Sequence, residues 1–212
     1  NHAIAAFAAA AKLDAVYVPL HFRARADELT YMVNDAAPSV LLVGQRYVDL
    51  VRSFSGDLDS VKHYVALEGA HEGWLDYERL LEAETGGPGR PQVDERDLLT
   101  INYTSGTTAR PKGVMMTHRN AYMNAVGTLV HVPMTCADRY LWTLPMFHAN
   151  GWTFVWIVTA VGGAHVCLRK VDPVQAFRLI RDEQVTMLCA APTVLIGLAS
   201  ASPEQRGEVP QG

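Results

Sequence analysis

Apolar residues recur along the chain with two different spacings, and these spacings predict an alternating series of helices and strands. In residues 26–35, Leu29, Met32 and Val33 fall on one face at spacings of three and four, as in an amphipathic helix. In residues 40–44, apolar residues follow one another without a polar interruption and end in a glycine. Such a continuous run is typical of a parallel strand that is buried on both faces.

The same alternation extends over the whole chain. Further helices are predicted over residues 3–13, 47–55, 76–84, 118–130, 152–161, 173–183 and 193–200. Further strands are predicted over residues 16–20, 63–67, 98–103, 140–144, 164–168 and 186–190. Strands that alternate with helices at this spacing indicate an α/β fold with mostly parallel sheets flanked by helices.

A turn-rich stretch divides this series. Residues 85–91 contain three glycines and two prolines, which is typical of a linker. We therefore expect a first α/β portion over residues 1–84, a linker over 85–97 and a second α/β portion over 98–212. Residues 203–212 are expected to form a polar tail rich in proline and glycine.

Composition and charge narrow the function classes. The chain has 212 residues, of which 49% are hydrophobic and 19% charged, so disorder is excluded as the main state. The 18 basic and 22 acidic residues give a net charge of −4, which disfavours nucleic acid as a partner. The most apolar stretch, residues 151–166, is too short and too interrupted by glycine for a membrane span. We expect a soluble, cytoplasmic protein without a signal peptide.

The cysteines give no sign of a disulfide framework or a metal site. Cys136, Cys167 and Cys189 are far apart and form no C-x-x-C pair, so we interpret them as buried thiols of a reduced protein. Other residues are also interpreted as interior packing, namely Met115, Met116, Met123, Trp156 and His165.

One stretch has the composition of an anion-binding loop. Directly after the predicted strand 98–103, residues 104–113 combine four hydroxyls, two glycines and a lysine. Glycine lets backbone amides approach an anion closely, hydroxyls add donors, and Lys112 supplies a point charge. The order of residues differs from G-x-x-x-x-G-K-[ST], so a P-loop kinase or GTPase is disfavoured.

Residues 103–120 resemble the signature loop of the adenylate-forming (AMP-binding) superfamily, which includes acyl-CoA synthetases, coumarate-CoA ligases, luciferases and adenylation domains of peptide synthetases. Residues 144–152 resemble the second motif of that superfamily, in the form that fatty acyl-CoA synthetases have. Residues 15–20 resemble the strand that precedes Asn-Pro-Arg in the superfamily, although this chain has His21-Phe22-Arg23 there. The resemblance implies part of the large N-terminal domain of an acyl-CoA synthetase.

The resemblance also implies an activity and its ligands. A fatty or related carboxylic acid would react with ATP to an acyl-adenylate and pyrophosphate, and CoA would then displace AMP. ATP and Mg²⁺ would be required, CoA would be a co-substrate, and a homodimer is allowed.

The same resemblance implies roles for individual residues. Thr104 would hold Mg²⁺ with its hydroxyl, and Lys112 would close over the phosphates as a catalytic residue. The β- and γ-phosphates would be wrapped by the loop residues Ser105, Gly106, Thr107 and Thr108. His148 would lie near the carboxylate and the adenylate as a second catalytic residue. Trp152 would line or gate the acyl tunnel. Trp156 lies four residues later, and this spacing predicts that both indoles share one helix face.

Two departures leave an alternative open. Ala109 stands where the superfamily usually has glycine, so the loop could belong to a non-catalytic nucleotide-binding or scaffold chain. The later superfamily motifs for adenine and the second metal ligand do not occur in the 212 residues, so we expect a truncated unit that is inactive alone. An adenylation domain for amino acids is disfavoured by Thr107-Thr108 and by residues 147–152.

Overall fold

The computed structural model describes residues 2–87, 89, 91–104 and 110–208, which form two compact units. The first unit is His2–His118, and the second begins at Arg119. The predicted α/β fold with mostly parallel sheets is confirmed. The units divide later in the chain than residues 85–97, because the strands at 98–117 pack with the first unit.

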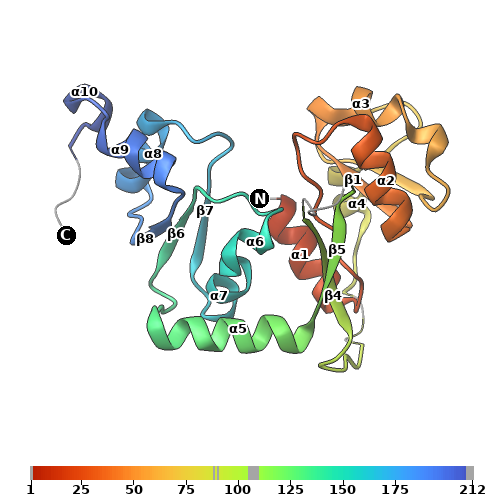
Figure 1. Ribbon diagram of the computed structural model, residues 1–212, viewed down its shortest axis with the longest axis horizontal. Helices are drawn as coiled ribbons and strands as arrows, with labels where there is room; N and C mark the ends of the chain where they lie inside the picture. Colours follow the sequence, from red (N-terminus) through yellow and green to blue (C-terminus); the bar gives the residue numbers. More distant parts are fainter. Residues whose placement is uncertain (1, 88, 90, 105–109, 209–212) are drawn as a thin grey trace. The chain divides into compact units, whose positions relative to one another are not determined.

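The first unit contains a parallel sheet and an antiparallel pair of strands (Figure 1). Its helices are α1 (His2–Lys12), α2 (Ala26–Ala36), α3 (Val48–Arg52) and α4 (Tyr77–Ala83), with 3-10 turns at Gln45–Tyr47 and Ser55–Asp57. Its strands are β1 (Val40–Val43), β2 (His63–Ala66), β3 (Leu75–Asp76), β4 (Leu98–Thr104) and β5 (Lys112–Thr117). The parallel sheet has the order β1-β2-β3, and β4 pairs with β5 in the antiparallel sense.

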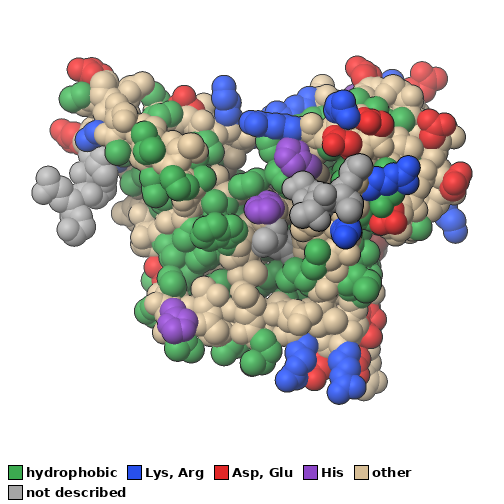
Figure 2. Space-filling view, in the orientation of Figure 1, with side chains coloured by type: hydrophobic (Ala, Val, Ile, Leu, Met, Phe, Trp, Pro, Cys, Tyr) green, Lys and Arg blue, Asp and Glu red, His purple; other side chains and the backbone are tan. Residues whose placement is uncertain are grey.

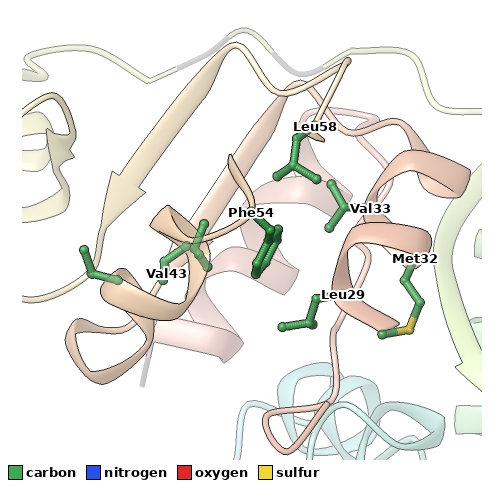
Figure 3. Packing of buried hydrophobic residues seen from close by; sticks show 8 residues of the cluster. Leu29, Met32, Val33, Val43, Phe54 and Leu58 are labelled. Atoms are coloured by element: carbon green, nitrogen blue, oxygen red, sulfur yellow. The ribbon is translucent and has the colours of Figure 1, made fainter. Parts of the chain in front are cut away.

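Helix α2 packs its apolar face into the core of the first unit. Leu29, Met32 and Val33, the three residues with helical spacing, are at most 9% exposed. They belong to one buried cluster with Val43 of β1 and with Phe54. Figure 3 shows the side chains of this cluster. Burial of each such side chain contributes about 1.5–3 kcal/mol, so the amphipathic pattern is sufficient to dock this helix.

The second unit is built on a three-stranded parallel sheet of order β7-β6-β8. Its strands are β6 (Arg139–Trp142), β7 (Ala164–Cys167) and β8 (Met187–Cys189). Its helices are α5 (His118–His131), α6 (Ala149–Trp152), α7 (Phe154–Ala160), α8 (Pro173–Asp182), α9 (Pro192–Ala199) and α10 (Pro203–Arg206). In Figure 1, α8 and α9 lie on the side of this sheet that is away from α7.

The central strand β6 is buried on both faces. Tyr140 and Leu141 are 0% exposed and Trp142 is 3% exposed. Leu141 joins one cluster with Val166, whereas the Tyr140 ring stacks on Phe154 of α7 at a centroid distance of 4.6 Å. Burial on both faces is typical of the central strand of a parallel sheet.

The strand predicted over residues 16–20 is reduced to a single bridge between Tyr17 and Thr100. Tyr17 donates its backbone N–H to the Leu99 carbonyl at 3.0 Å, and its own carbonyl accepts from Ile101 at 3.1 Å. Pro19 has no backbone N–H, so the next position that could donate to β4 is lost and the pairing ends.

The helix predicted over residues 152–161 begins later, at Phe154. Trp152 and Thr153 adopt left-handed backbone angles, with φ of 56° and 64°, and this interrupts the helix. Trp152 and Trp156 therefore do not share one helix face, and that prediction was wrong. Residues 203–212 were predicted to form a polar tail, but residues 203–206 form helix α10 with Ser202 as its N-cap. That part of the prediction was wrong.

Three of the residues expected in the interior are at the surface. Met115 is 70% exposed, Met123 is 53% exposed, and Cys136 is exposed. On α5, Met123 belongs to a row of exposed apolar side chains that also includes Tyr122, Val126 and Val130. Figure 2 shows apolar side chains along the edge where Figure 1 draws α5. Within the described residues, no helix combines the length and the apolar composition needed to cross a membrane.

Candidate functional site

The predicted anion-binding loop joins the two strands of the β4–β5 hairpin. Thr104 is the last residue of β4 and Lys112 is the first of β5, and the two are register partners. Both are exposed, so a hydroxyl and an ammonium group stand at the two ends of the loop. The predicted loop residues Ser105, Gly106, Thr107 and Thr108, together with Ala109, lie outside the described residues.

Gly113 has a packing role in this hairpin. It pairs with Tyr103 across the strands, and a Cβ atom at Gly113 would lie 2.8 Å from Ile101 Cγ2 and 3.4 Å from Tyr103 Cζ. A larger residue would push the Ile101 and Tyr103 side chains away. The glycine after Lys112 thus allows the two strands to stay closely paired where the loop begins.

Both ends of the loop are also tied to α2. The Tyr103 hydroxyl donates to Asp35 Oδ2 at 2.6 Å, and the Arg110 guanidinium lies 5.2 Å from the centroid of the Tyr31 ring. Tyr31 and Asp35 are four residues apart, so they lie on the same face of the helix. Burial and the neighbouring Asp35 carboxylate raise the pKa of Tyr103 above its ordinary value, which keeps the hydroxyl protonated as a donor.

Removing the Tyr103 hydroxyl tests this connection. We expect Tyr103→Phe to lower the free energy of unfolding by about 1 kcal/mol, because the lost hydrogen bond is partly solvated at the exposed Asp35. In the complete protein, KM for ATP should rise by about two- to fivefold. Thermal denaturation and steady-state kinetics measure the two effects.

The matched control removes another tyrosine hydroxyl of the same unit. Tyr64 donates to the Ser55 carbonyl at 3.3 Å and belongs to the parallel sheet. Tyr64→Phe should lower stability without changing KM for ATP. An equal rise in KM for both variants would contradict a specific link between Tyr103 and the loop.

The second predicted motif forms a tight turn after β6. His148 accepts from the Gly151 N–H at its carbonyl, at 2.9 Å, and donates its own N–H to the Pro145 carbonyl at 3.2 Å. His148 and Trp152 are both exposed, Trp152 at 59%. The two predicted acid-binding residues therefore stand at the surface of the second unit, available to a ligand.

The backbone of this turn is strained. Gly151, Trp152 and Thr153 have consecutive φ values of 61°, 56° and 64°. For a non-glycine residue such a conformation costs about 1–3 kcal/mol. The Thr153 hydroxyl, which can donate one hydrogen bond, lies 2.7 Å from Asn124 Oδ1 of α5 and 2.6 Å from the Trp152 carbonyl oxygen. Strain of this kind is concentrated at functional sites, in agreement with a ligand-binding role for the turn.

The structure groups the predicted site residues into two sets. Thr104 and Lys112 lie together on the hairpin of the first unit, and His148 and Trp152 lie together on the turn of the second. Sequence reasoning missed Asp35, which lies 68 positions from its partner Tyr103. No motif or spacing links residues so far apart, so only the fold could reveal this contact.

The described residues could hold a magnesium ion only if phosphate oxygens supplied most of its ligands. They contain no group of three or more His, Cys, Asp or Glu side chains that could hold a metal ion. Mg²⁺ in phosphoryl-transfer sites is held by few protein oxygens, with the remainder from phosphate and water. The exposed hydroxyl of Thr104 suits that single-ligand role.

An apolar cavity of about 740 Å³ in the first unit contains none of these residues. It is lined by α1, by β1 and by the extended segment around Tyr17. The hairpin and the turn therefore remain two candidate segments, each within its own unit.

Comparison with known proteins decides the family. A family model described as "AMP-binding enzyme" matches residues 2–211. The chain belongs to the AMP-binding enzyme family. This confirms the resemblance carried by residues 103–120 and 144–152, and it gives the loop on the β4–β5 hairpin its family context.

Relatives within the AMP-binding family are CoA ligases. The chain is 38% identical over 193 residues to 4-hydroxybutyrate–CoA ligase 2 of Metallosphaera sedula, covering 87% of this chain and 35% of that protein. It is 36% identical over 198 residues to peroxisomal benzoate–CoA ligase of Arabidopsis thaliana, covering 85% and 34%. A solved fatty acyl CoA synthetase of Mycobacterium tuberculosis superposes with a TM-score of 0.81 at 27% identity, covering 93% of this chain and 38% of that one. The chain thus spans about a third of the length of these curated relatives.

Proposed function

We propose that the complete protein is an ATP-dependent acyl-CoA synthetase, to which this chain contributes the phosphate-binding hairpin and the acid-binding turn. The observation that carries the proposal is the pairing of Thr104 with Lys112 at the two ends of a loop rich in glycine and hydroxyls, in a member of the AMP-binding family. The names of the relatives support the class of reaction, since both curated examples are CoA ligases.

The proposed reaction has two steps. A carboxylate oxygen attacks the α-phosphorus of ATP, the bond to the β-phosphate oxygen breaks, and pyrophosphate leaves. The sulfur of CoA, whose thiol proton passes to water, then attacks the acyl carbon of the adenylate and forms the thioester, and AMP leaves with the electrons of its bond to the acyl carbon. Both steps require donors positioned around phosphate oxygens.

The residues of this chain supply binding and orientation in the first step. Lys112 donates hydrogen bonds and positive charge to the phosphates, and Thr104 provides a hydroxyl oxygen toward a magnesium ion. A magnesium ion held there would supply positive charge to the phosphates. His148 orients the carboxylate, and Trp152 forms an apolar wall for the acyl group.

We propose that the substrate is a fatty or related carboxylic acid. We also propose that the enzyme is cytoplasmic. The motif at residues 144–152 supports the acyl assignment, and the relatives' names extend from 4-hydroxybutyrate to benzoate. The substrate panel for the test must therefore include both aliphatic and aromatic acids.

Pyrophosphate release from the complete gene product tests the proposal. Butyrate, octanoate and benzoate are each supplied with ATP, Mg²⁺ and CoA, and acyl-CoA is measured by chromatography. Pyrophosphate release that depends on one of the acids and yields its acyl-CoA is expected. Absence of release with every acid would favour the non-catalytic alternative raised by Ala109.

The isolated 212-residue chain is expected to bind ATP·Mg too weakly to measure. It spans 35% of the length of a relative, and the superfamily motifs for adenine and the second metal ligand do not occur in its 212 residues. Isothermal titration should show no saturable heat. A micromolar dissociation constant would contradict this expectation and would mean that the hairpin binds nucleotide on its own.

A further inference from the structure

We propose that His165 is a positioning residue for the turn that carries His148 and Trp152, and that it acts through the indole of Trp142. His165 and Trp142 both lie outside the two motifs, residues 103–120 and 144–152. The expected effect on the kinetics rests on the proposed function. The expected effect on the position of the turn rests only on contacts within the second unit.

The hydrogen bonds of His165 define its protonation and its orientation. Trp142 Nε1 lies 3.0 Å from His165 Nδ1, and an indole N–H can only donate. Nδ1 must therefore be an unprotonated acceptor, so the neutral ring carries its proton on Nε2. Nε2 lies 3.0 Å from Thr159 Oγ1 and donates to it.

The chain of donors ends on the backbone of α7. Thr159 donates its hydroxyl to the Val155 carbonyl at 2.6 Å, so every polar hydrogen in the series has an acceptor. Burial lowers the pKa of His165, which favours the neutral ring that this series needs. His165 thereby connects β6, β7 and α7 through side chains alone.

The same contacts hold the Trp142 indole in one plane. Trp142 is 3% exposed, its ring lies nearly parallel to that of His165 at 14°, and Tyr140 meets it edge-on at a centroid distance of 5.1 Å. A rotation of the indole about its side-chain bonds would break the bond to Nδ1 and lose the stacking. Trp142 thus presents a fixed surface to whatever packs on it.

The residue that packs on this surface is Gly151, in the middle of the turn. A Cβ atom at Gly151 would overlap Trp142 Cζ3 and lie 2.9 Å from Cη2, so its backbone sits directly on the indole. Gly151 also donates to the His148 carbonyl and is followed by Trp152. The indole plane consequently determines where the backbone between the two predicted acid-binding residues lies.

Three variants of the complete gene product separate positioning from general stability. His165→Phe keeps a ring for stacking but loses both hydrogen bonds, whereas His165→Gln keeps one acceptor and one donor. Val166→Ala is the matched control, because Val166 is the next residue of β7, is buried, and packs in the cluster with Leu141 and Ala176. Val166 is the register partner of Leu141, so its truncation weakens the same sheet through the Leu141 cluster and leaves the His165 side chain in place.

Amide hydrogen exchange over residues 148–153 gives the structural readout. His165→Phe should accelerate exchange there by about tenfold or more, while His165→Gln stays within about threefold of the unsubstituted protein. Val166→Ala should leave this segment unchanged. Equal acceleration by the phenylalanine and alanine variants, or none with phenylalanine, would overturn the positioning role.

Steady-state kinetics with butyrate, octanoate and benzoate give the functional readout. With the acid that is turned over, His165→Phe should raise KM for the acid by about five- to tenfold and leave KM for ATP within about twofold. A parallel rise in both constants would overturn the kinetic part. If the unsubstituted protein releases no pyrophosphate, the proposed function fails, and hydrogen exchange still decides whether His165 positions the turn.

Discussion

Replacing Lys112 by alanine in the complete protein is expected to lower kcat/KM for ATP by about 10²- to 10³-fold, the usual consequence of removing one positioned donor from a charged transition state. Lys112 is exposed at the first position of β5 and is the register partner of Thr104. Its ammonium group is therefore free to reach phosphate oxygens bound at the loop, and no change in the hairpin itself is expected from the substitution.

The design of this experiment includes two further variants. Lys112→Arg retains the positive charge and should recover part of the activity, although its planar fork differs from a compact ammonium group. Lys62→Ala removes another exposed lysine of the first unit, just before β2, and should leave the kinetics unchanged. If Lys112→Ala kept full activity, the hairpin would not be the phosphate site.

Gly151→Ala should lower the stability of the second unit by about 2–5 kcal/mol, from overpacking and a left-handed backbone together. The added Cβ would overlap the Trp142 ring, which is held by His165 and cannot retreat easily. The φ of 61° adds strain for any residue with a side chain. The turn should move, and acid-dependent turnover should fall by about tenfold or more.

Gly127→Ala is the matched control for this change. Gly127 lies within α5, and a Cβ there would have nothing within 4 Å. Alanine in a helix interior is favoured over glycine by about 0.5–1 kcal/mol, so this variant should be as stable as the original or more so. Urea denaturation compares the pair directly. If the Gly151→Ala protein were as stable and active as the Gly127→Ala protein, the Trp142 indole would have moved to make room for the Cβ, and the prediction would be wrong.

Predictions from the sequence succeeded where one element contains its own signal. The spacing of Leu29, Met32 and Val33 placed α2 correctly, and the strand predicted over residues 140–144 overlaps β6. In both cases the element is buried in the way its pattern requires, so the local period carries enough information. The same is true of α8, which begins after Asp172, whose side chain caps it.

Predictions failed where a neighbour in space overrides local preference. Residues 16–20 have the composition of a strand, yet only Tyr17 finds a partner on β4. The helix predicted from Trp152 is broken by two left-handed residues, a conformation that Trp and Thr do not adopt by propensity. Such a turn persists because the surrounding contacts of Gly151 and Thr153 hold it.

In the candidate segments, the sequence and the fold contribute different residues. Thr104, Lys112, His148 and Trp152 came from motifs, because the chemistry of a short loop is encoded in consecutive residues. The partners that hold these segments in place came from elsewhere in the chain. His165 lies 23 positions from Trp142, and no sequence period connects the two.

The amino-acid order alone therefore specified the α/β class, the family and the short segments for which we propose the chemistry, since periodicity and motifs are local properties. The tertiary structure decided which side chains support those segments. Only folding brings Asp35 to Tyr103 and His165 to Trp142, and it places Gly151 against an indole that excludes any side chain there. These contacts depend on strand register and helix docking, which are settled by burial over the whole unit.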